Sequence, residues 1–256
     1  MRLPPAMIQR AREFTGPPAA ARPAATVVLL RPHVEAFQVY VLQRATTMVF
    51  GGVYAFPGGV VDPSDSPETI RTDWADRLGV PDERARAVVG AAARELFEEA
   101  GVMLAGPAEQ PDRTVTDVST PDWEADRAAV LRRELTMTDL LARRGLRLRD
   151  DLLLPWSRWI TPEFEPKRYD TWFFVALLPD SQSPRDVSGE SQTTAWIDPA
   201  TRDLPMLPPT RSTLRLLADC PTIPDVVAAA VHRDAATPLR PRVELTDDQV
   251  IFHDPE

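Results

Sequence analysis

The sequence has few of the residues that form cross-links or zinc sites. Its single cysteine, Cys220, rules out a disulfide within the chain. Its three histidines, at positions 33, 232 and 253, show no zinc-ligand spacing with that cysteine. We therefore expect a protein stabilised by packing in a reducing compartment, with Cys220 as a small buried hydrophobic residue.

Lysine is almost absent, because Lys167 is the only one and every other basic residue apart from the histidines is an arginine. With 29 basic and 38 acidic residues, the chain carries a net charge of −9. A broad basic face that tracks nucleic-acid phosphates is therefore disfavoured, although a local arginine pocket for a phosphate is not. We expect a small-molecule partner and no nucleic acid.

Long apolar runs are missing too. No segment approaches the roughly 18 apolar residues that a membrane-spanning helix requires. Residues 1–23 contain no apolar core of a secretory signal peptide. These absences favour a soluble, cytoplasmic protein without a membrane partner.

What is present is typical of a globular chain of 256 residues, with 43% hydrophobic and 26% charged residues. Strand-like and helix-like segments are interleaved, which predicts an α/β layered fold. We expect a proline-rich, loosely packed arm at 1–23, one domain at 24–232 and a tail at 233–256. The expected strands are 25–30, 37–42, 53–56, 157–160 and 171–178, a run that ends at 196–199, and a short strand within 243–256. The expected helices are 66–78, 83–100, 123–144, 208–218 and 224–231.

The expected strand 53–56 ends abruptly at Pro57-Gly58-Gly59. Glycine accepts a positive φ and lets the backbone approach another group closely. We therefore expect a loop at these residues that lies against a ligand.

Three glutamates gather near the C-terminal end of the expected helix 83–100. Glu95, Glu98 and Glu99 are spaced i, i+3 and i+4, so they fall on one flank within an arc of about 100°. Their mutual repulsion, and their position at the negative end of the helix dipole, indicate a nearby cation. Without histidine or cysteine close by, this oxygen ligand set best suits Mg²⁺ or Mn²⁺. On spacing alone, a solvated acidic face with an Arg94–Glu98 ion pair remains the alternative.

These residues resemble the signature of the Nudix hydrolase family. That signature reads glycine, five residues, an acidic residue, a gap, and then Arg-Glu-apolar-x-Glu-Glu-x-Gly-apolar. The second half is matched in full by residues 94–102, Arg-Glu-Leu-Phe-Glu-Glu-Ala-Gly-Val. The first half is matched by Gly59 and by Asp65, which stands where the pattern usually has Glu. The resemblance implies an α/β/α sandwich with a mixed central sheet.

One departure points to a branch of that family. Residues 66–93 separate Asp65 from Arg94, where the pattern ordinarily has seven residues, so 21 residues are inserted. Residues 66–81, with an expected helix, make up most of this insertion. The insertion resembles that of the coenzyme A diphosphatases of the peroxisomal kind and their bacterial relatives. We also expect added C-terminal helices at 208–232. The likeness extends over about 24–230 and rests on Val-Leu-Gln-Arg at 41–44, Phe-Pro-Gly-Gly-Val-Val-Asp at 56–62, Trp74, and the segments 159–162, 167–174 and 207–210.

The resemblance implies a role for each residue of the signature. Glu95, Glu98 and Glu99 would hold the metal, and the carbonyl of Gly58 would complete its shell. Glu95 would also orient or deprotonate water, although which glutamate acts as the base stays open. Arg94 would serve catalysis by holding the glutamates in their rotamers, not by contacting substrate.

The family often recruits one more carboxylate from a loop before a late tryptophan. Glu190, six residues ahead of Trp196, fits that place, and Asp186 is the second choice. A solvated loop carboxylate is the alternative interpretation of Glu190.

The branch resemblance implies hydrolysis of the pyrophosphate bond of coenzyme A or acyl-CoA, giving 3′,5′-ADP and (acyl-)4′-phosphopantetheine. The phosphates of such a substrate require basic side chains, for which Arg44, Lys167 and Arg168 are the candidates. Gly59 is expected to approach the substrate as well. Each basic side chain is also readable as an ordinary surface charge.

Two other functions stay open. One is pyrophosphate hydrolysis of a different nucleoside diphosphate derivative, such as ADP-ribose, NADH or an oxidised nucleotide, since specificity lies in loops and not in the metal-binding motif. The other is a nucleotide-binding module without catalysis, against which the intact residues 94–102 argue. A homodimer is also left open.

Overall fold

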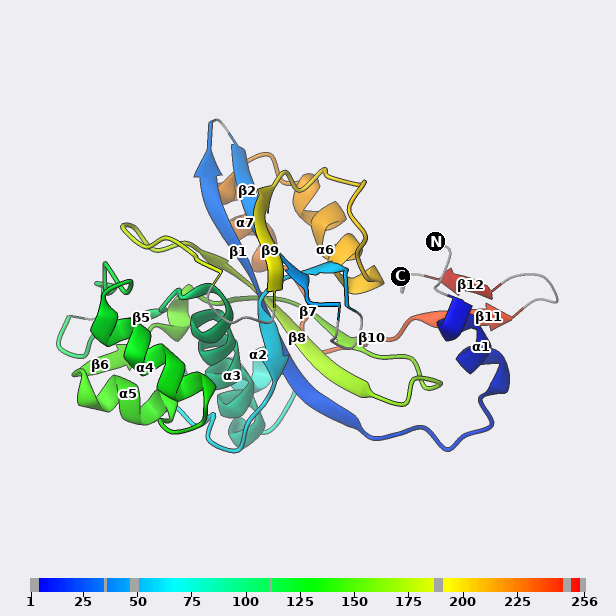
Figure 1. Ribbon diagram of the computed structural model, residues 1–256, viewed down its shortest axis with the longest axis horizontal. Helices are drawn as coiled ribbons and strands as arrows, with labels where there is room; N and C mark the ends of the chain where they lie inside the picture. The colour runs from blue at the N-terminus through cyan, green and yellow to red at the C-terminus, as the bar shows by residue number, and fades with distance from the viewer. Residues whose placement is uncertain are drawn as a thin grey trace.

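The computed structural model describes residues 5–34, 36–46, 51–110, 112–186, 191–245 and 250–253 (Figure 1). Its helices are α1 Pro5–Glu13, α2 Trp74–Leu78, α3 Asp82–Ala100, α4 Pro121–Leu131, α5 Met137–Arg143, α6 Pro208–Ala218 and α7 Ile223–Ala230, with a short 3₁₀ helix at Asp150–Leu152. Its strands are β1 Ala21–His33, β2 Ala36–Arg44, β3 Tyr54–Ala55, β4 Gly58–Val60, β5 Ala105–Pro107, β6 Leu146–Leu148, β7 Leu154–Ile160, β8 Arg168–Leu177, β9 Ser191–Ile197, β10 Pro238–Leu239, β11 Arg242–Leu245 and β12 Val250–His253.

The central sheet is mixed. Strand β1 runs parallel to β8 over ten residue pairs and antiparallel to β2 at its C-terminal end. Beyond β8 the sheet continues to β7, antiparallel, and then to β10, parallel. Strand β2 pairs with β3 and with β9, both antiparallel. Parallel and antiparallel pairs in one sheet confirm the mixed sheet that the sequence predicts.

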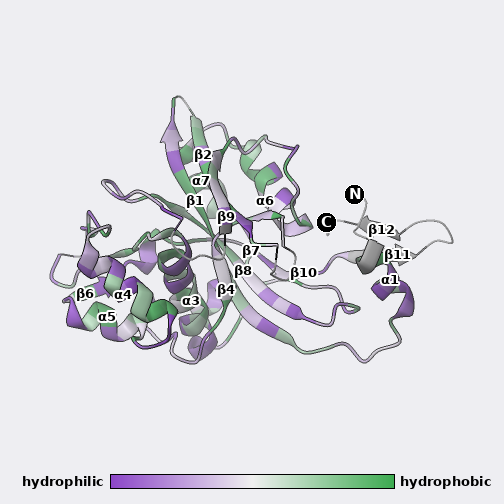
Figure 2. Ribbon diagram, viewed as in Figure 1, coloured by the Kyte–Doolittle hydropathy of each residue, from purple (hydrophilic) through white to green (hydrophobic). Residues whose placement is uncertain are grey.

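Helices cover both faces of this sheet. Successive side chains of a strand point to opposite faces, so Val27 and Leu29 of β1 pack with α2, α3, α4 and α5, whereas Val28 and Leu30 pack with α6 and α7. Figure 1 shows α3 and α6 on opposite sides of the sheet. In Figure 2 hydrophobic residues concentrate on β1, β2 and α6, whereas α1 is mainly hydrophilic. The α/β/α sandwich is confirmed.

The edge of β1 opposite β8 is divided between two partners. Residues 24–26 pair with β4, whereas residues 30–33 pair with β2. Strand β4 pairs with β1 and also contacts helix α3. This division brings the glycines of β4 beside the C-terminal turns of α3.

The inserted segment is part of the core. Trp74 of α2 is fully buried, and its ring packs edge-on against Phe174 with 5.8 Å between centroids. Its indole Nε1–H donates to Asp150 at 2.7 Å. The predicted helix 66–78 is wrong in its length, because only residues 74–78 are helical.

The first half of that predicted helix instead bonds to side chains. The backbone N–H of Arg71 donates to Asp150 at 2.8 Å. The Arg86 guanidinium binds the carbonyls of Pro67 and Glu68 at 2.7 and 2.9 Å. Because side chains outside the segment form hydrogen bonds with these backbone groups, the segment does not need the backbone hydrogen bonds of a helix.

The predicted helix 123–144 is two helices, α4 and α5. The chain stops α4 by placing Arg133 in the left-handed region, with φ of 61°. It starts α5 with Thr136, whose hydroxyl accepts from the backbone N–H of Asp139 at 3.0 Å. The spacing of Thr136 and Asp139 is a sequence signal for a helix start that the prediction did not use.

Within the predicted loose arm at 1–23, the prediction is wrong for residues 5–13 and 21–23, whereas residues 14–20 are exposed and form neither helix nor strand. Residues 5–13 form α1, with Met7 and Ala11 buried, and β1 already begins at Ala21. Arg10 forms an ion pair with Glu165 at 2.9 Å, which ties α1 to the loop between β7 and β8. A proline in the first turn of a helix removes no intrahelical hydrogen bond, so Pro5 is compatible with α1.

The tail also contains more structure than predicted. Strand β10 pairs with β7, and β11 and β12 form an antiparallel ribbon in register from Arg242↔His253 to Leu245↔Val250. Helix α1 lies beside β11, close to both ends of the chain (Figure 1). The single predicted strand within 243–256 is therefore a pair of strands.

Two simpler expectations can be compared with the fold. Cys220 is buried in the core that α6 and α7 form with the sheet, as expected. In the part of the chain that the structure describes, no helix combines the length and apolarity needed to cross a bilayer.

Candidate active site

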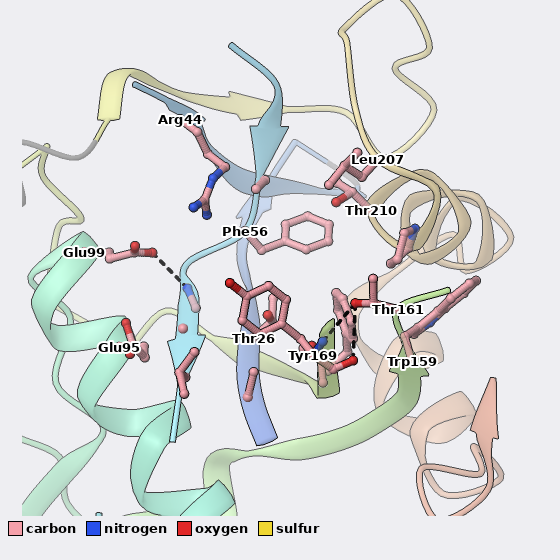
Figure 3. Close-up of a pocket in the computed structure, with 18 of the residues that line it drawn as sticks. Thr26, Arg44, Phe56, Glu95, Glu99, Trp159, Thr161, Tyr169, Leu207 and Thr210 are labelled. Carbon is pink, nitrogen blue, oxygen red and sulfur yellow. Dashed lines mark hydrogen bonds between the residues drawn. The ribbon is translucent and has the colours of Figure 1, made fainter. Parts of the chain in front are cut away.

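The last two turns of α3 place three carboxylates in one pocket. Glu95, Glu98 and Glu99 all line a cavity of about 460 Å³. They are only 7, 3 and 6% exposed, so the alternative of a solvated acidic face is wrong. Figure 3 shows Glu95 and Glu99 extending from α3 toward the neighbouring strand.

Arg94 holds this cluster from the side away from the pocket. Its Nε and Nη2 donate to the two carboxylate oxygens of Asp65 at 2.7 and 2.9 Å. Its Nη1 donates to Glu95 at 2.7 Å and to Glu98 at 3.2 Å. Arg94 is 1% exposed and does not line the pocket. It therefore orients the glutamates, and Asp65, despite replacing the usual Glu, forms the fork-shaped pair that fixes Arg94.

Gly58 and Gly59 belong to β4, not to a loop, and neither has a positive φ. The N–H of Gly58 donates to Glu99 Oε2 at 2.8 Å, whereas the resemblance implies a metal contact for the Gly58 carbonyl. A Cβ at Gly58 would lie 2.5 Å from the Ala25 carbonyl oxygen, and one at Gly59 would collide with the Glu95 carboxylate. Glycine is required here because β4 passes so close to β1 and α3.

Replacing Gly59 with Ala should separate activity from stability. The atoms nearest to the added Cβ are the end of the Glu95 side chain, so the protein should fold with Glu95 displaced and lose about 100-fold in turnover. Gly58→Ala collides with the backbone of β1 and should instead lower the free energy of unfolding. Urea unfolding and steady-state kinetics on both variants measure this; equal turnover in Gly59→Ala and wild type contradicts the placement of Glu95.

Burial sets the electrostatics of the cluster. It raises the pKa of Glu95 to about 7, although the neighbouring Arg94 opposes the shift. Burial also raises the pKa of Glu98, against the opposing effects of Arg94 and Arg133. The arginines therefore compensate these two carboxylates only in part.

The donor set suits a divalent cation in its chemistry. Three carboxylates on adjacent turns, without sulfur or imidazole, are hard oxygen ligands of the kind that Mg²⁺ and Mn²⁺ prefer. As placed, however, no three acidic, histidine or cysteine side chains among the described residues are grouped so as to hold a metal ion. An oxygen of Glu98 is engaged by Arg133 and by Arg94. An ion bound to this oxygen would compete with both guanidinium groups.

Of the predicted substrate-binding residues, Arg44 and Gly59 line the pocket. The buried Nε of Arg44 has no hydrogen-bond partner within the described part of the chain. Figure 3 shows its guanidinium directed into the space between Glu99 and Phe56. The guanidinium of an arginine that lines a cavity is well placed to pair with an anionic ligand oxygen.

Lys167 and Arg168 are not brought to the pocket. Lys167 is exposed, and neither residue is part of the cavity lining. The Arg168 guanidinium donates to the carbonyls of Ala19 and Thr161 at 2.7 and 3.1 Å, so it fixes the start of β8. Their proximity in sequence to pocket residues does not place their side chains inside it.

The proposed distant carboxylate is not placed by the structure. Glu190 lies outside the described residues. The second choice, Asp186, is described and does not line the pocket.

Sequence reasoning missed three contributors to the pocket. Met7 of α1 and Pro241, which precedes β11, join the wall from the two ends of the chain. Arg133 reaches the cluster from the segment after α4. Prolines near Met7 favoured an extended arm, and no motif includes Arg133, so only the tertiary structure reveals them.

Comparison with known proteins agrees with this geometry. No protein-family model matches the chain. A Caenorhabditis elegans protein named "Putative nudix hydrolase 7" is 30% identical over 179 residues, which cover 70% of this chain and 52% of that protein. The chain thus spans about half the length of this curated relative.

The crystal structure of a NUDIX hydrolase from Alicyclobacillus acidocaldarius has a TM-score of 0.69 and 28% identity, covering 85% of this chain and 99% of the other. The signature at residues 94–102, the fold and these two likenesses together support membership of the Nudix hydrolase superfamily.

Proposed function

We propose that the protein is a metal-dependent hydrolase of the pyrophosphate bond in coenzyme A or acyl-CoA, which releases 3′,5′-ADP and (acyl-)4′-phosphopantetheine. The observation that carries this proposal is one pocket that contains both the signature glutamates and Arg44. Carboxylates are the ligands for Mg²⁺ or Mn²⁺, and a guanidinium with an unsatisfied N–H suits a phosphate oxygen.

In this proposal each residue of the cluster has one task. A bound Mg²⁺ or Mn²⁺ supplies charge for the phosphoryl oxygens and acidifies water. Glu98 and Glu99 would hold the ion, and Glu190, outside the described residues, is proposed as a further ligand. Glu95 orients the attacking water and takes its proton. Arg94 keeps the carboxylates in place through its hold on Glu95 and Glu98.

The wall of the pocket supports the coenzyme A branch. All residues of the segments 159–162 and 207–210, on which the resemblance to that branch partly rests, line the same cavity as the glutamates. Figure 3 shows Trp159, Thr161, Leu207 and Thr210 on the side opposite α3. Two of the segments that carry the branch resemblance therefore line the pocket in which we propose that the substrate binds.

A substrate panel tests this assignment. Purified protein with Mg²⁺ or Mn²⁺ should give its highest kcat/KM on coenzyme A and acetyl-CoA, compared with ADP-ribose, NADH and nucleoside triphosphates. Preference for ADP-ribose or NADH would keep the site and overturn the substrate. Cleavage of none of them would favour a nucleotide-binding module.

Arg44→Met tests the phosphate contact. Loss of a charged hydrogen bond is expected to raise KM for coenzyme A about 10- to 100-fold, corresponding to roughly 1.5–3 kcal/mol. Lys167→Met is the matched control, because Lys167 is exposed and off the pocket, and its KM should change less than about twofold. A larger effect at Lys167 than at Arg44 would reverse the assignment.

A further inference from the structure

Arg133 reaches the carboxylate cluster from outside the signature. Its Nη1 contacts Glu98 Oε1 and also donates to the Val130 carbonyl at 3.1 Å. Its Nε lies 3.4 Å from an oxygen of Asp62. The side chain lines the pocket and is 43% exposed. Arg133 is thus a cation at the surface of the cluster with space to move.

The backbone of Arg133 has the left-handed conformation that glycine adopts most readily. The N–H of Arg133 donates to the Val130 carbonyl, and the N–H of Glu134 donates to the Ala129 carbonyl, both at 2.9 Å. This pair of bonds is the Schellman motif that ends α4, with Arg133 at the left-handed position where glycine is commonest. An arginine at this position is strained relative to glycine, and its side chain has a specific target.

We propose that Arg133 is an exchangeable counter-ion of the metal site. Without a divalent ion its guanidinium neutralises Glu98 and Asp62. When an ion takes Glu98, the guanidinium leaves and binds the diphosphate oxygens of the substrate. The second half of this proposal rests on the proposed function, whereas the first half does not.

The contrast with Arg94 explains why Arg133 is the residue that moves. Both donate to the same oxygen of Glu98. Arg94 is 1% exposed and held by both oxygens of Asp65. Besides Glu98, Arg133 contacts the Val130 carbonyl at 3.1 Å and Asp62 at 3.4 Å, and its side chain is open to the pocket. Exchange at Glu98 therefore displaces Arg133 and leaves Arg94 in place.

The first test measures Mn²⁺ affinity without substrate, by the electron paramagnetic resonance signal of free Mn²⁺. Arg133→Gly removes the side chain and suits the backbone, so the variant should fold at least as stably as wild type. It should bind Mn²⁺ about tenfold more tightly, because a competing cation is gone. Arg133→Lys should lie between the two. Arg132→Gln should match wild type, because Arg132 is exposed, pairs with Glu134 and does not line the pocket.

The second test measures KM for coenzyme A at saturating Mn²⁺. Arg133→Gly should raise KM about tenfold, with partial rescue by Arg133→Lys. Unchanged or weaker Mn²⁺ binding in the folded Arg133→Gly protein would overturn the counter-ion role. Tighter Mn²⁺ binding with unchanged KM would overturn the diphosphate role. If wild type cleaves no diphosphate, the proposed function fails, while the Mn²⁺ titration still decides the counter-ion role.

Discussion

Replacing Glu98 with Gln is expected to lower kcat for coenzyme A hydrolysis by about three orders of magnitude, roughly 4 kcal/mol of transition-state stabilisation. The substitution keeps the shape of the side chain and removes the charge that holds a divalent ion. Glu98 is 3% exposed, so a carboxylate on the protein surface is poorly placed to take over its role as a metal ligand. Product chromatography at saturating substrate and metal measures the loss.

The matched control for this prediction is Glu134→Gln. Glu134 undergoes the same chemical change at an exposed position, where it pairs with Arg132. Its kcat should stay within about twofold of wild type. Urea unfolding of both variants checks that they are folded. A kcat of Glu98→Gln within tenfold of wild type would show that the ion is not held at Glu98.

Replacing Arg94 with Met is expected to reduce the free energy of unfolding by about 3–5 kcal/mol. The Arg94 and Asp65 side chains are each 1% exposed, so the substitution leaves a buried carboxylate without its cation. It also removes the donor shared by Glu95 and Glu98. A lower urea midpoint with an unchanged m-value measures the effect as a stability change.

Two further variants show whether this loss comes from the buried pair. Arg132→Met, at an exposed arginine in an ion pair, should change stability by less than about 1 kcal/mol. Asp65→Asn combined with Arg94→Met should cost less than the sum of the single changes, because the two residues are in contact. A loss below about 1 kcal/mol for Arg94→Met would mean that the buried pair contributes no more than a surface pair.

The sequence predicted the carboxylate helix well because its signals are local. The apolar spacing within 83–100 and the stop at Gly101 set the bounds of α3, which the structure places at Asp82–Ala100 with Gly101 at φ of 63°. The spacing of the glutamates placed them on one flank, and all three line the pocket. Neither inference depends on distant parts of the chain.

The positions of the candidate basic side chains were less predictable because they depend on strand pairing. Arg44 ends β2 and its guanidinium enters the pocket. Arg168 begins β8, where pairing with the start of β1 brings its guanidinium to the Ala19 carbonyl instead. Composition and spacing do not distinguish these two arginines.

The ends of the chain show the same limit. Prolines at 17, 18 and 23 favoured an arm, yet Met7 packs into the pocket wall and Pro241 joins it from the other end. Contacts between segments so far apart in sequence leave no periodic pattern. Arg133 was missed because its backbone lies in the left-handed region, which is unusual for arginine and which the sequence does not indicate.

The most direct test of the central claim is product chromatography after incubation of the purified protein with coenzyme A and Mg²⁺ or Mn²⁺, with and without a chelator. The account predicts 3′,5′-ADP and 4′-phosphopantetheine in equal amounts, formed only when no chelator removes the metal. Intact coenzyme A with both metals, in a preparation shown to be folded, would contradict it.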